Sequence, residues 1–431
     1  MQKTNYKKGR KILISILISL IKIVFLLGFL IFIHELGHFA VAKLCKVKVN
    51  EFAIGFGPTI WRKQGKQTKY ALRLIPLGGF ISMEGEDEHS EEEGSFTKAS
   101  IPKRMAIVVA GATVNILFAI IVYFILASTQ GNFISTKIES MVPEYAAVNS
   151  GLQVNDEIVA VDGKNIHLRT DIDEILQKSE GKTLQITVKR NGENVTIPVT
   201  PTAKEYKSTG IYLQGGDSET TKILMVDKGS TSEAHGIQAN DKIIEINDNV
   251  VTNQEQIIEK INQTQGDNLK LKIQRGNEEI IIELPLDKVN AYYLGVQFQQ
   301  ADNSFGNSIY YGFWNTIDFL SSIVQNVANM FTGNVSINQM MGPVGISEVV
   351  AKTNGIKEFV YMLALISISL GITNLLPIPA LDGGKLLLLI IEAIRGKRLS
   401  EKMEMNIQLL GFAFLITLSL IVTYQDILRL M

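Results

Sequence analysis

Cysteine, tryptophan, histidine and proline are all scarce in this sequence of 431 residues, with one, two, five and ten copies. The single cysteine, Cys45, excludes an internal disulfide framework and is most simply a small apolar residue at a helix end. Lysine and arginine (42) nearly balance aspartate and glutamate (43), so the net charge is −1. The sequence contains no concentrated basic patch, which argues against nucleic-acid binding.

Charged residues are distributed very unevenly along the chain and are scarce in some stretches. Residues 129–303 hold 17 Lys and Arg against 26 Asp and Glu, so the remainder carries +8. That remainder contains four apolar stretches long enough to cross a bilayer, and the stretch 105–127 has no charged residue. A basic remainder around apolar spans is typical of a membrane protein with a positive cytoplasmic face. We therefore expect an α-helical polytopic membrane protein with four transmembrane helices.

The first apolar stretch contains the sequence His34-Glu35-Leu36-Gly37-His38. Residues four apart on a helix lie about one turn apart on the same face, so both imidazoles point to one side. At this spacing two neutral imidazoles can share one Zn²⁺, and Glu35 can act as general base toward water. A chance pentapeptide or a satisfied pair of core histidines is the alternative. Ionisable residues in apolar surroundings are costly and usually functional, which favours metal chemistry.

A break in the apolar stretch 359–394 supplies a further candidate ligand. Pro377 and Pro379 lie two residues apart, which a regular helix cannot accommodate. Irregular backbone at membrane depth is tolerated only where it lines protein or a wet cavity. Asp382 follows the two prolines, and we predict it as the third metal ligand beside the two histidines, with a fourth position open. A helix-capping aspartate just outside the membrane is the alternative.

The polar loop after the first span predicts a β hairpin. Thr68–Leu74 alternates with period two and predicts a strand, and Pro76–Phe80 predicts a turn. Phe52–Pro58 is a candidate partner strand. A hairpin beside a metal site could pair with a substrate strand, although an ordinary loop hairpin fits the sequence equally well.

Two further motifs favour structural interpretations. The acidic run Glu84–Glu93, which includes His89, is interpreted as a solvated loop rather than as a metal cluster. Gly111–Asn115 in the second span offers small residues for close helix packing, and the amide of Asn115 can add an interhelical hydrogen bond.

Residues 131–300 contain an internal repeat with an offset of 85 positions. Gly151–Val159 matches Gly236–Ile244, and Leu184–Arg190 matches Leu269–Arg275. Each copy predicts a turn, a strand, a helix and a strand pair, which implies two small α+β domains. Both domains resemble PDZ domains, which bind peptides by adding a strand to a sheet edge.

Basic residues predict the topology. With four spans, the basic loop 45–104 and the basic turn 395–405 lie on one side, which we place in the cytoplasm, and the repeats lie outside. The basic N-terminus also prefers the inside, which conflicts with this arrangement.

The predicted organisation is a first transmembrane helix (1–44), a cytoplasmic loop with a β hairpin (45–104), a second transmembrane helix (105–128), a first PDZ-like domain (129–206), a second PDZ-like domain (207–303), an amphipathic interfacial segment (304–355), a third transmembrane segment (356–394), a cytoplasmic turn (395–405) and a fourth transmembrane helix (406–431).

The paired metal motifs, the four spans and the PDZ-like repeats between spans two and three together resemble the site-2 protease family, in particular its bacterial regulator-of-sigma-E type. The motifs that carry the resemblance are His34–His38 and Leu381–Gly384. The resemblance implies that His34, His38 and Asp382 ligate zinc and that Glu35 activates water. It also implies a membrane-associated β hairpin and six substrate-binding residues: Asn374, Pro377, Pro379, Gly78, Gly79 and Phe80.

By this resemblance the protein would be a zinc metalloendopeptidase of the cell membrane that acts in regulated intramembrane proteolysis. Its substrates would be single-span membrane proteins, such as anti-sigma factors already trimmed by another protease, and remnant signal peptides. The active site would lie near the cytoplasmic side of the bilayer. A non-catalytic membrane PDZ scaffold with a structural metal site is the alternative, and a metal transporter would leave the repeats unexplained. The intact Glu35 counts against the scaffold, because a structural zinc has no need of a general base.

Overall fold

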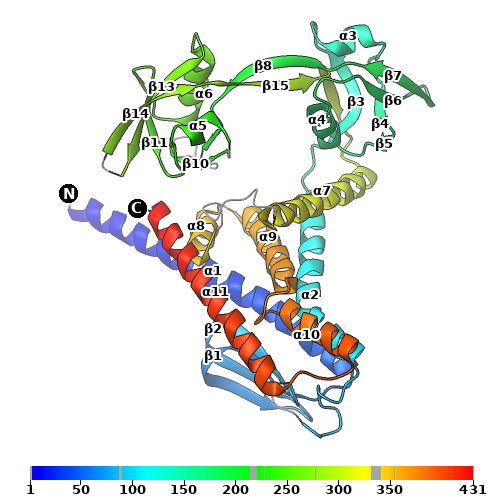
Figure 1. Cartoon of the computed structure of the whole chain (residues 1–431), viewed down its shortest axis with the longest axis vertical. Helices are drawn as coiled ribbons and strands as arrows, with labels where there is room; N and C mark the ends of the chain where they lie inside the picture. Colours follow the sequence, from blue (N-terminus) through cyan, green and yellow to red (C-terminus); the bar gives the residue numbers. More distant parts are fainter. Residues whose placement is uncertain are drawn as a thin grey trace. The chain divides into compact units, whose positions relative to one another are not determined.

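The computed structural model describes residues 2–86, 90–213, 221–227, 229–276, 278–331, 341–353 and 355–430. The chain folds into two compact units. The helical unit combines residues 1–126 with 341–428, and the β-rich unit is built from residues 127–340 (Figure 1). All residues that the sequence predicts for metal chemistry belong to the helical unit.

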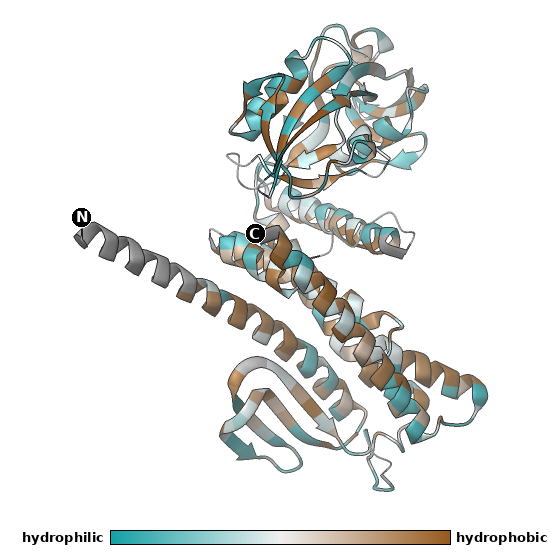
Figure 2. Cartoon of the chain, turned by 60° about the vertical axis from the view of Figure 1, so that its left-hand side comes forward, coloured by the Kyte–Doolittle hydropathy of each residue, from teal (hydrophilic) through white to brown (hydrophobic). Residues whose placement is uncertain are grey.

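The described part of the helical unit contains six helices: α1 (Gln2–Leu44), α2 (Ile101–Ser128), α8 (Pro343–Lys352), α9 (Ile356–Leu375), α10 (Asp382–Arg395) and α11 (Glu401–Leu430). Four segments in them are long and apolar enough to cross a membrane: Leu17–Leu44, Ile101–Ser128, Ile356–Leu375 and Glu401–Leu428. Many large apolar side chains on these segments are exposed. The apolar composition of the helices is seen as brown ribbon in Figure 2. Such surface fits contact with lipid. The expectation of four membrane-spanning helices is confirmed at the level of length and composition.

The predicted break in the third apolar stretch separates α9 from α10. Ala380 within the break has a left-handed backbone with φ of 72°. Gly383 and Gly384 then let the start of α10 fold back closely onto the break. A Cβ atom on Gly383 would lie 2.2 Å from the carbonyl oxygen of Leu376, and one on Gly384 would lie 2.3 Å from that of Ile378. Because both positions lack a side chain, the first turn of α10, which includes Asp382, can lie close to the end of α9.

The loop between α1 and α2 contains two antiparallel strands, β1 (Val49–Gln64) and β2 (Lys69–Met83). Both strands bend, so the first half of β1 pairs with both halves of β2. Ile54, for example, pairs with Leu72 and also with Gly79. Within the described residues, 79–83 pair with 49–54 and with no other strand. The end of β2 is therefore the edge of a small sheet.

The segment Pro76–Phe80, which the sequence predicts as a turn, instead continues β2 as a bent strand. Gly78 has a φ of 105° and makes the bend. Gly79 and Phe80 rejoin the ladder because they find partners in β1. The small sheet packs on the helices through a buried cluster that includes Ala42 of α1 and Ile107 of α2.

The β-rich unit contains two modules, each with its own apolar core. Module A comprises β3 (Ile134–Met141), α3 (Ala146–Ser150), β4 (Glu157–Val161), β5 (Lys164–Asn165), α4 (Arg169–Lys178), β6 (Leu184–Arg190), β7 (Glu193–Val199) and β16 (Val296–Gln300). Its sheet has the order β16-β3-β4-β6-β7, with β5 paired to β4.

Module B comprises β9 (Ile211–Leu213), β10 (Ile223–Val226), α5 (Thr231–Ala234), β11 (Lys242–Ile246), β12 (Asn249–Val250), α6 (Gln254–Gln263), β13 (Asn268–Arg275) and β14 (Glu278–Pro285). Its strands form a sheet of order β12-β11-β13-β14 and a separate pair, β10-β9. A two-stranded ribbon of β8 (Thr202–Ser208) and β15 (Asp287–Tyr293) joins the two modules.

The modules are nested rather than consecutive. The sequence predicts two contiguous domains divided at residue 207, whereas β16 returns to module A and pairs with β3. Module B is therefore inserted between β7 and β16. The repeat could not reveal this arrangement, because β16 lies outside the matching segments and its partner is distant in the sequence.

After β16 the chain continues into α7 (Phe305–Phe331), which packs on module A. The ring of Tyr311 stacks on that of Phe133 at 4.9 Å, and the ring of Trp314 stacks on His167 at 3.4 Å. Aromatic contacts of this kind contribute beyond simple apolar burial and give α7 a defined docking face.

Candidate metal centre

The two motif histidines lie on one face of α1 and are both buried, with 8% exposure each. Their Nε2 atoms are 3.2 Å apart. The Nδ1 atom of His38 lies 2.8 Å from the carbonyl oxygen of Ile107 on α2. Because a carbonyl oxygen can only accept, Nδ1 of His38 carries the proton and the lone pair of Nε2 faces His34.

Asp382 at the start of α10 completes the cluster. Its Oδ2 atom lies 3.2 Å from Nε2 of His34 and 3.4 Å from Nε2 of His38. One ligand atom from each of the three residues lies within 4.8 Å of the others. Two imidazole nitrogens and one carboxylate oxygen are a common ligand set for catalytic zinc. The three ligands predicted from the sequence are thus brought together by the fold.

The surroundings of the cluster fit a metal ion. Oδ2 of Asp382 is buried and has no hydrogen-bond donor among the described residues, and buried polar atoms rarely remain unsatisfied. Gly111 of α2 faces the rings without a side chain. A Cβ atom there would lie 2.4 Å from Nε2 of His38 and 2.8 Å from Nε2 of His34. The glycine therefore lets α2 approach the two ring nitrogens without blocking them.

Asn115 has a role that the sequence does not indicate. Its side-chain amide lies 3.4 Å from Nδ1 of His34, and Asn115 is fully buried. The atom that lies there is Nδ2. A flip of the amide, which exchanges Nδ2 and Oδ1, lets Oδ1 accept from Nδ1 and leaves Nε2 of His34 free for a metal. The flipped orientation also gives a partner to Oδ1 of Asn115, which otherwise has none among the described residues. The sequence predicts only a hydrogen bond between helices here, and its partner is the metal-site imidazole.

Glu35 lies beside the histidines in a pocket of about 250 Å³. The pocket has a polar part, with the three candidate ligands, and an apolar part formed by α2 and the end of β2. Gly79 of β2 is close, because a Cβ atom there would lie 3.5 Å from Cγ of Glu35. The complete lining is His34, Glu35, His38, Phe80, Ile81, Met83, Glu86, Ile107, Val108, Asp382 and Lys385.

The six predicted substrate-binding residues are not all near this pocket. Phe80 lines the pocket, and Gly79 approaches Glu35. Gly78 lies against the ring of Phe56 at the bend of β2. The remaining three, Asn374, Pro377 and Pro379, belong to the last turn of α9 and the break after it, and they are not part of the pocket lining.

Two charged pocket residues, Glu86 and Lys385, have no place in the sequence prediction. The sequence predicts that the acidic run Glu84–Glu93 is a solvated loop. In the structure, Glu86 in the first part of this run lines the pocket. Glu92 and Glu93 are exposed, as predicted, and residues 87–89 lie outside the described part of the chain. The position of Lys385 one turn after Asp382 is the signal that could have identified it.

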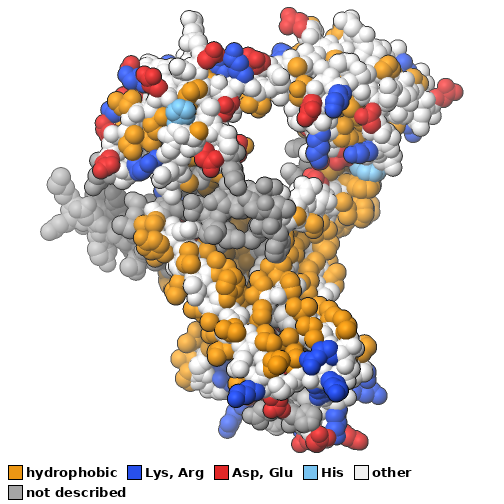
Figure 3. Space-filling model, viewed as in Figure 1, with side chains coloured by type: hydrophobic (Ala, Val, Ile, Leu, Met, Phe, Trp, Pro, Cys, Tyr) orange, Lys and Arg blue, Asp and Glu red, His pale blue; other side chains and the backbone are white. Residues whose placement is uncertain are grey.

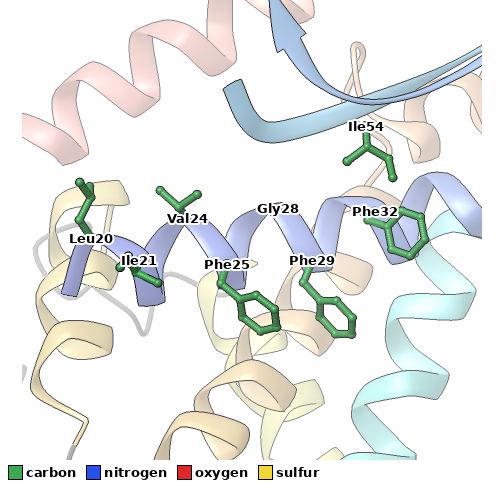
Figure 4. Close-up of a pocket in the computed structure, with 8 residues that line it drawn as sticks. All are labelled: Leu20, Ile21, Val24, Phe25, Gly28, Phe29, Phe32 and Ile54. Carbon is green, nitrogen blue, oxygen red and sulfur yellow. The ribbon is translucent and has the colours of Figure 1, made fainter. Parts of the chain in front are cut away.

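A larger apolar pocket of about 500 Å³ runs along α1 (Figure 4). Seven residues of α1 and Ile54 of β1 line it: Leu20, Ile21, Val24, Phe25, Gly28, Phe29, Phe32 and Ile54. Its lining offers no titratable group, so the chemistry belongs to the smaller pocket.

Comparison with known proteins identifies the family. The profile of Peptidase family M50 matches residues 22–418. The zinc metalloprotease RasP of Bacillus licheniformis is 31% identical over 96% of this chain and 99% of its own length. The regulator of sigma E protease of Haemophilus influenzae is 29% identical over 96% and 100%, and the regulator of sigma-E protease RseP of Escherichia coli is 28% identical over 97% and 100%.

Among solved structures, the HtrA3 PDZ domain bound to a phage-derived ligand is 19% identical with a TM-score of 0.19, and the match covers 21% of this chain and 93% of that domain. The family profile covers far more than half of the chain. The chain therefore belongs to peptidase family M50, the site-2 protease family, and is an intramembrane zinc metalloendopeptidase.

Proposed function

We propose that His34, His38 and Asp382 hold the catalytic zinc ion and that Glu35 is the general base and acid. The observation that supports this most strongly is the convergence of two imidazole nitrogens and an unpaired carboxylate oxygen on one point beside Glu35. Bound zinc supplies a Lewis acid that polarises the scissile carbonyl group.

The residues of the chain then move the protons. The Glu35 carboxylate takes a proton from the attacking water as the water oxygen bonds to the carbonyl carbon. It returns the proton to the amide nitrogen as the carbon–nitrogen bond breaks, which leaves a carboxylic acid and an amine. Asn115 and the carbonyl of Ile107 orient the two imidazoles throughout.

The substrate must be extended at the cleaved bond, because a helix shields its own amides. We assign the edge at residues 79–83 as the strand that pairs with it, in a hairpin associated with the membrane. The edge is unpaired on one side among the described residues and lies next to Glu35. Asn374, Pro377 and Pro379 are assigned to the same substrate path through the family resemblance, at a greater distance from the metal.

Modules A and B are proposed as PDZ-like domains outside the cytoplasm. The 85-residue repeat, with one ten-residue helix in each module, supports the assignment. The cytoplasmic side is assigned to the end of the helical unit with the α10–α11 turn, where Lys and Arg gather below the orange surface of Figure 3. Arg395, Lys397 and Lys402 at this turn are all exposed.

Segment 304–355 is proposed as an interfacial segment, and its residues 332–340 and 354 lie outside the described part of the chain. In α7, Tyr311 is buried against Phe133, whereas Phe305, Ile309 and Phe313 are exposed. One face of α7 thus packs on module A, and another presents large apolar side chains, as expected for a helix at a membrane surface.

The proposed substrates are single-span membrane proteins, such as anti-sigma factors trimmed beforehand, and remnant signal peptides. The names of the sigma-E regulator relatives support the first class. A non-catalytic scaffold is disfavoured, because Glu35 lines the metal pocket, where a structural zinc would not need it.

The decisive experiment measures zinc content and cleavage of a single-span substrate in detergent for the wild type, Glu35→Gln and Glu93→Gln. Glu93 is exposed on the loop after β2 and serves as the matched control. We expect one zinc per chain in all three proteins and a loss of about 10³-fold in cleavage only for Glu35→Gln, the usual scale of acid–base catalysis. Wild-type cleavage by Glu35→Gln would refute the assignment.

A further inference from the structure

Two charged residues that the proposed mechanism does not use lie in the wall of the metal pocket. Lys385 is one turn after Asp382 on α10, and Glu86 follows the end of β2. Nζ of Lys385 lies 2.7 Å from Oε1 of Glu86, and the side chains are 32% and 16% exposed. A partly buried ion pair therefore joins the helix that carries Asp382 to the strand that ends beside Glu35.

A second ion pair holds α10 farther from the pocket. Glu392 lies about two turns after Lys385 on the same side of α10. It accepts two hydrogen bonds from Arg104, at 2.6 and 3.0 Å, and Arg104 is buried at the start of α2. Neither residue belongs to the pocket lining. The two pairs thus fasten different parts of α10, one at the pocket and one away from it.

We propose that the Lys385–Glu86 ion pair is a positioning latch that keeps the end of β2 in register with the metal ligands. The inference rests on the proposed function, since it takes β2 as the strand that aligns the substrate. A peptide paired with residues 79–83 presents its cleavable bond to the metal only if β2 and α10 keep a fixed spacing. Lys385 and Glu86 act through that spacing and need not touch the reacting atoms.

The physical basis is the limited solvation of the pair. A charge-assisted hydrogen bond in a partly buried site is stronger than one in water. Removing one partner deprives the other charged group in the pocket wall of this ion pair, which costs more than removing both. The latch therefore predicts that the two single substitutions are non-additive.

The test compares Lys385→Met, Glu86→Gln, the double variant and Lys385→Arg in the full-length protein. We expect each neutral single variant to lower kcat by about 10-fold or more, because small misplacements of bound substrate have large effects on rate. KM and the zinc content should stay within about twofold of wild type if only the register is lost. The double variant should lose no more than the worse single variant, and Lys385→Arg should stay close to wild type.

Amide hydrogen exchange at the end of β2 tests the proposed latch independently of activity. Peptides that cover residues 79–86 should exchange faster in Lys385→Met and Glu86→Gln than in the wild type. The matched control is the double variant Arg104→Met with Glu392→Gln, which removes the other ion pair of α10. It should lower the unfolding temperature but leave kcat of the zinc-loaded protein and exchange at 79–86 unchanged.

Three results would overturn the latch: multiplied losses in the double variant, a Lys385→Arg variant as slow as Lys385→Met, or wild-type exchange at residues 79–86 in both single variants. Failure of the proposed function gives a different pattern, because Glu35→Gln would then cleave as fast as the wild type whatever the latch variants do.

Discussion

The two units of this protein treat buried aspartates differently. In the β-rich unit, Asp156 and Asp241 are each 1% exposed and occupy equivalent positions of the two modules. Arg190 donates to both oxygens of Asp156, at 2.8 and 2.7 Å, and Arg275 donates to both oxygens of Asp241, at 2.7 Å each. Each arginine also donates to a nearby backbone carbonyl group. These carboxylates are fully provided with donors.

Among the described residues of the helical unit, Asp426 is satisfied in a similar way and Asp382 is not. Asp426 of α11 is also 1% exposed and accepts from the backbone N–H groups of Gly342 and Gly345 at the start of α8. Asp382 faces two imidazole nitrogens instead, and its Oδ2 atom has no donor within the part of the chain that the structure describes.

Burial therefore does not distinguish a candidate metal-binding carboxylate from a structural one, whereas the partners of the carboxylate do. An aspartate held by arginine or by backbone N–H groups has its charge and its lone pairs satisfied within the chain. An aspartate whose neighbours are nitrogen lone pairs has no such compensation within these contacts, and a bound cation would supply it.

The strongest test of this difference replaces each of the two aspartates of the helical unit by asparagine and measures zinc binding. Asp382→Asn should lower the affinity for zinc by more than about 100-fold, because loss of a ligand exceeds the effect of losing an outer hydrogen-bond partner. Asp426→Asn should leave zinc affinity unchanged. Competition with a chelator measures both values. Equal zinc affinity in Asp382→Asn and the wild type would exclude Asp382 as a ligand.

The corresponding change in the β-rich unit should affect stability and leave the metal alone. Asp156→Asn weakens charged hydrogen bonds in module A, which should cost about 2 kcal/mol of local stability. Hydrogen exchange of peptides from β6 and β7 in the full-length protein reads this loss. The zinc content should stay at the wild-type value, and a loss of zinc would contradict the separation of the two roles.

The stability of module A should also depend on pH through the ionisation of Asp156. Burial acts to raise the pKa of Asp156, but the Arg190 guanidinium and the N–H of Gln153 outweigh it and hold that pKa below its usual value. The stabilisation is therefore complete above the pKa of an unfolded aspartate, about 4, and is lost as pH falls through the lower folded pKa. The stability difference between wild type and Asp156→Asn should shrink over that acidic range. A difference that stays constant there would show that ionisation of Asp156 is not its source.

The smallest effect concerns the orientation of His34. Asn115→Leu removes the acceptor for Nδ1 and should weaken zinc binding by about 10-fold, within the range for such partners. Asn115→Asp keeps an acceptor oxygen at the same place and should bind zinc at least as well as the wild type. If both variants bind zinc like the wild type, Asn115 serves only helix packing.

Several features of the molecule were predictable from the sequence because they are local. The spans follow from apolar composition over some twenty residues. The pairing of His34 with His38 follows from the helical repeat, and the break before Asp382 follows from two prolines that no helix accommodates. The 85-residue repeat similarly predicted two compact α+β modules, each with its own core.

The predicted strand and turn at 68–80 were wrong in part, because the structure there depends on contacts between residues distant in the sequence. Pro76 and Gly78 are turn residues by local preference. Gly79 and Phe80 nevertheless extend β2, because β1 supplies ladder partners that local preference cannot foresee. The predicted boundary at residue 207 differs from the structure for the same reason, since β16 finds its partner in β3.

By itself the sequence determined which groups can bind a metal, which stretches can cross a membrane and which segments repeat, since these depend on neighbours within a few turns. Only the tertiary structure decided which groups meet. It brought Asp382 to the histidines, Gly111 and Asn115 to their rings, and Lys385 to Glu86. These contacts join distant segments through the packing of helices and strands, which residue spacing along the chain does not specify.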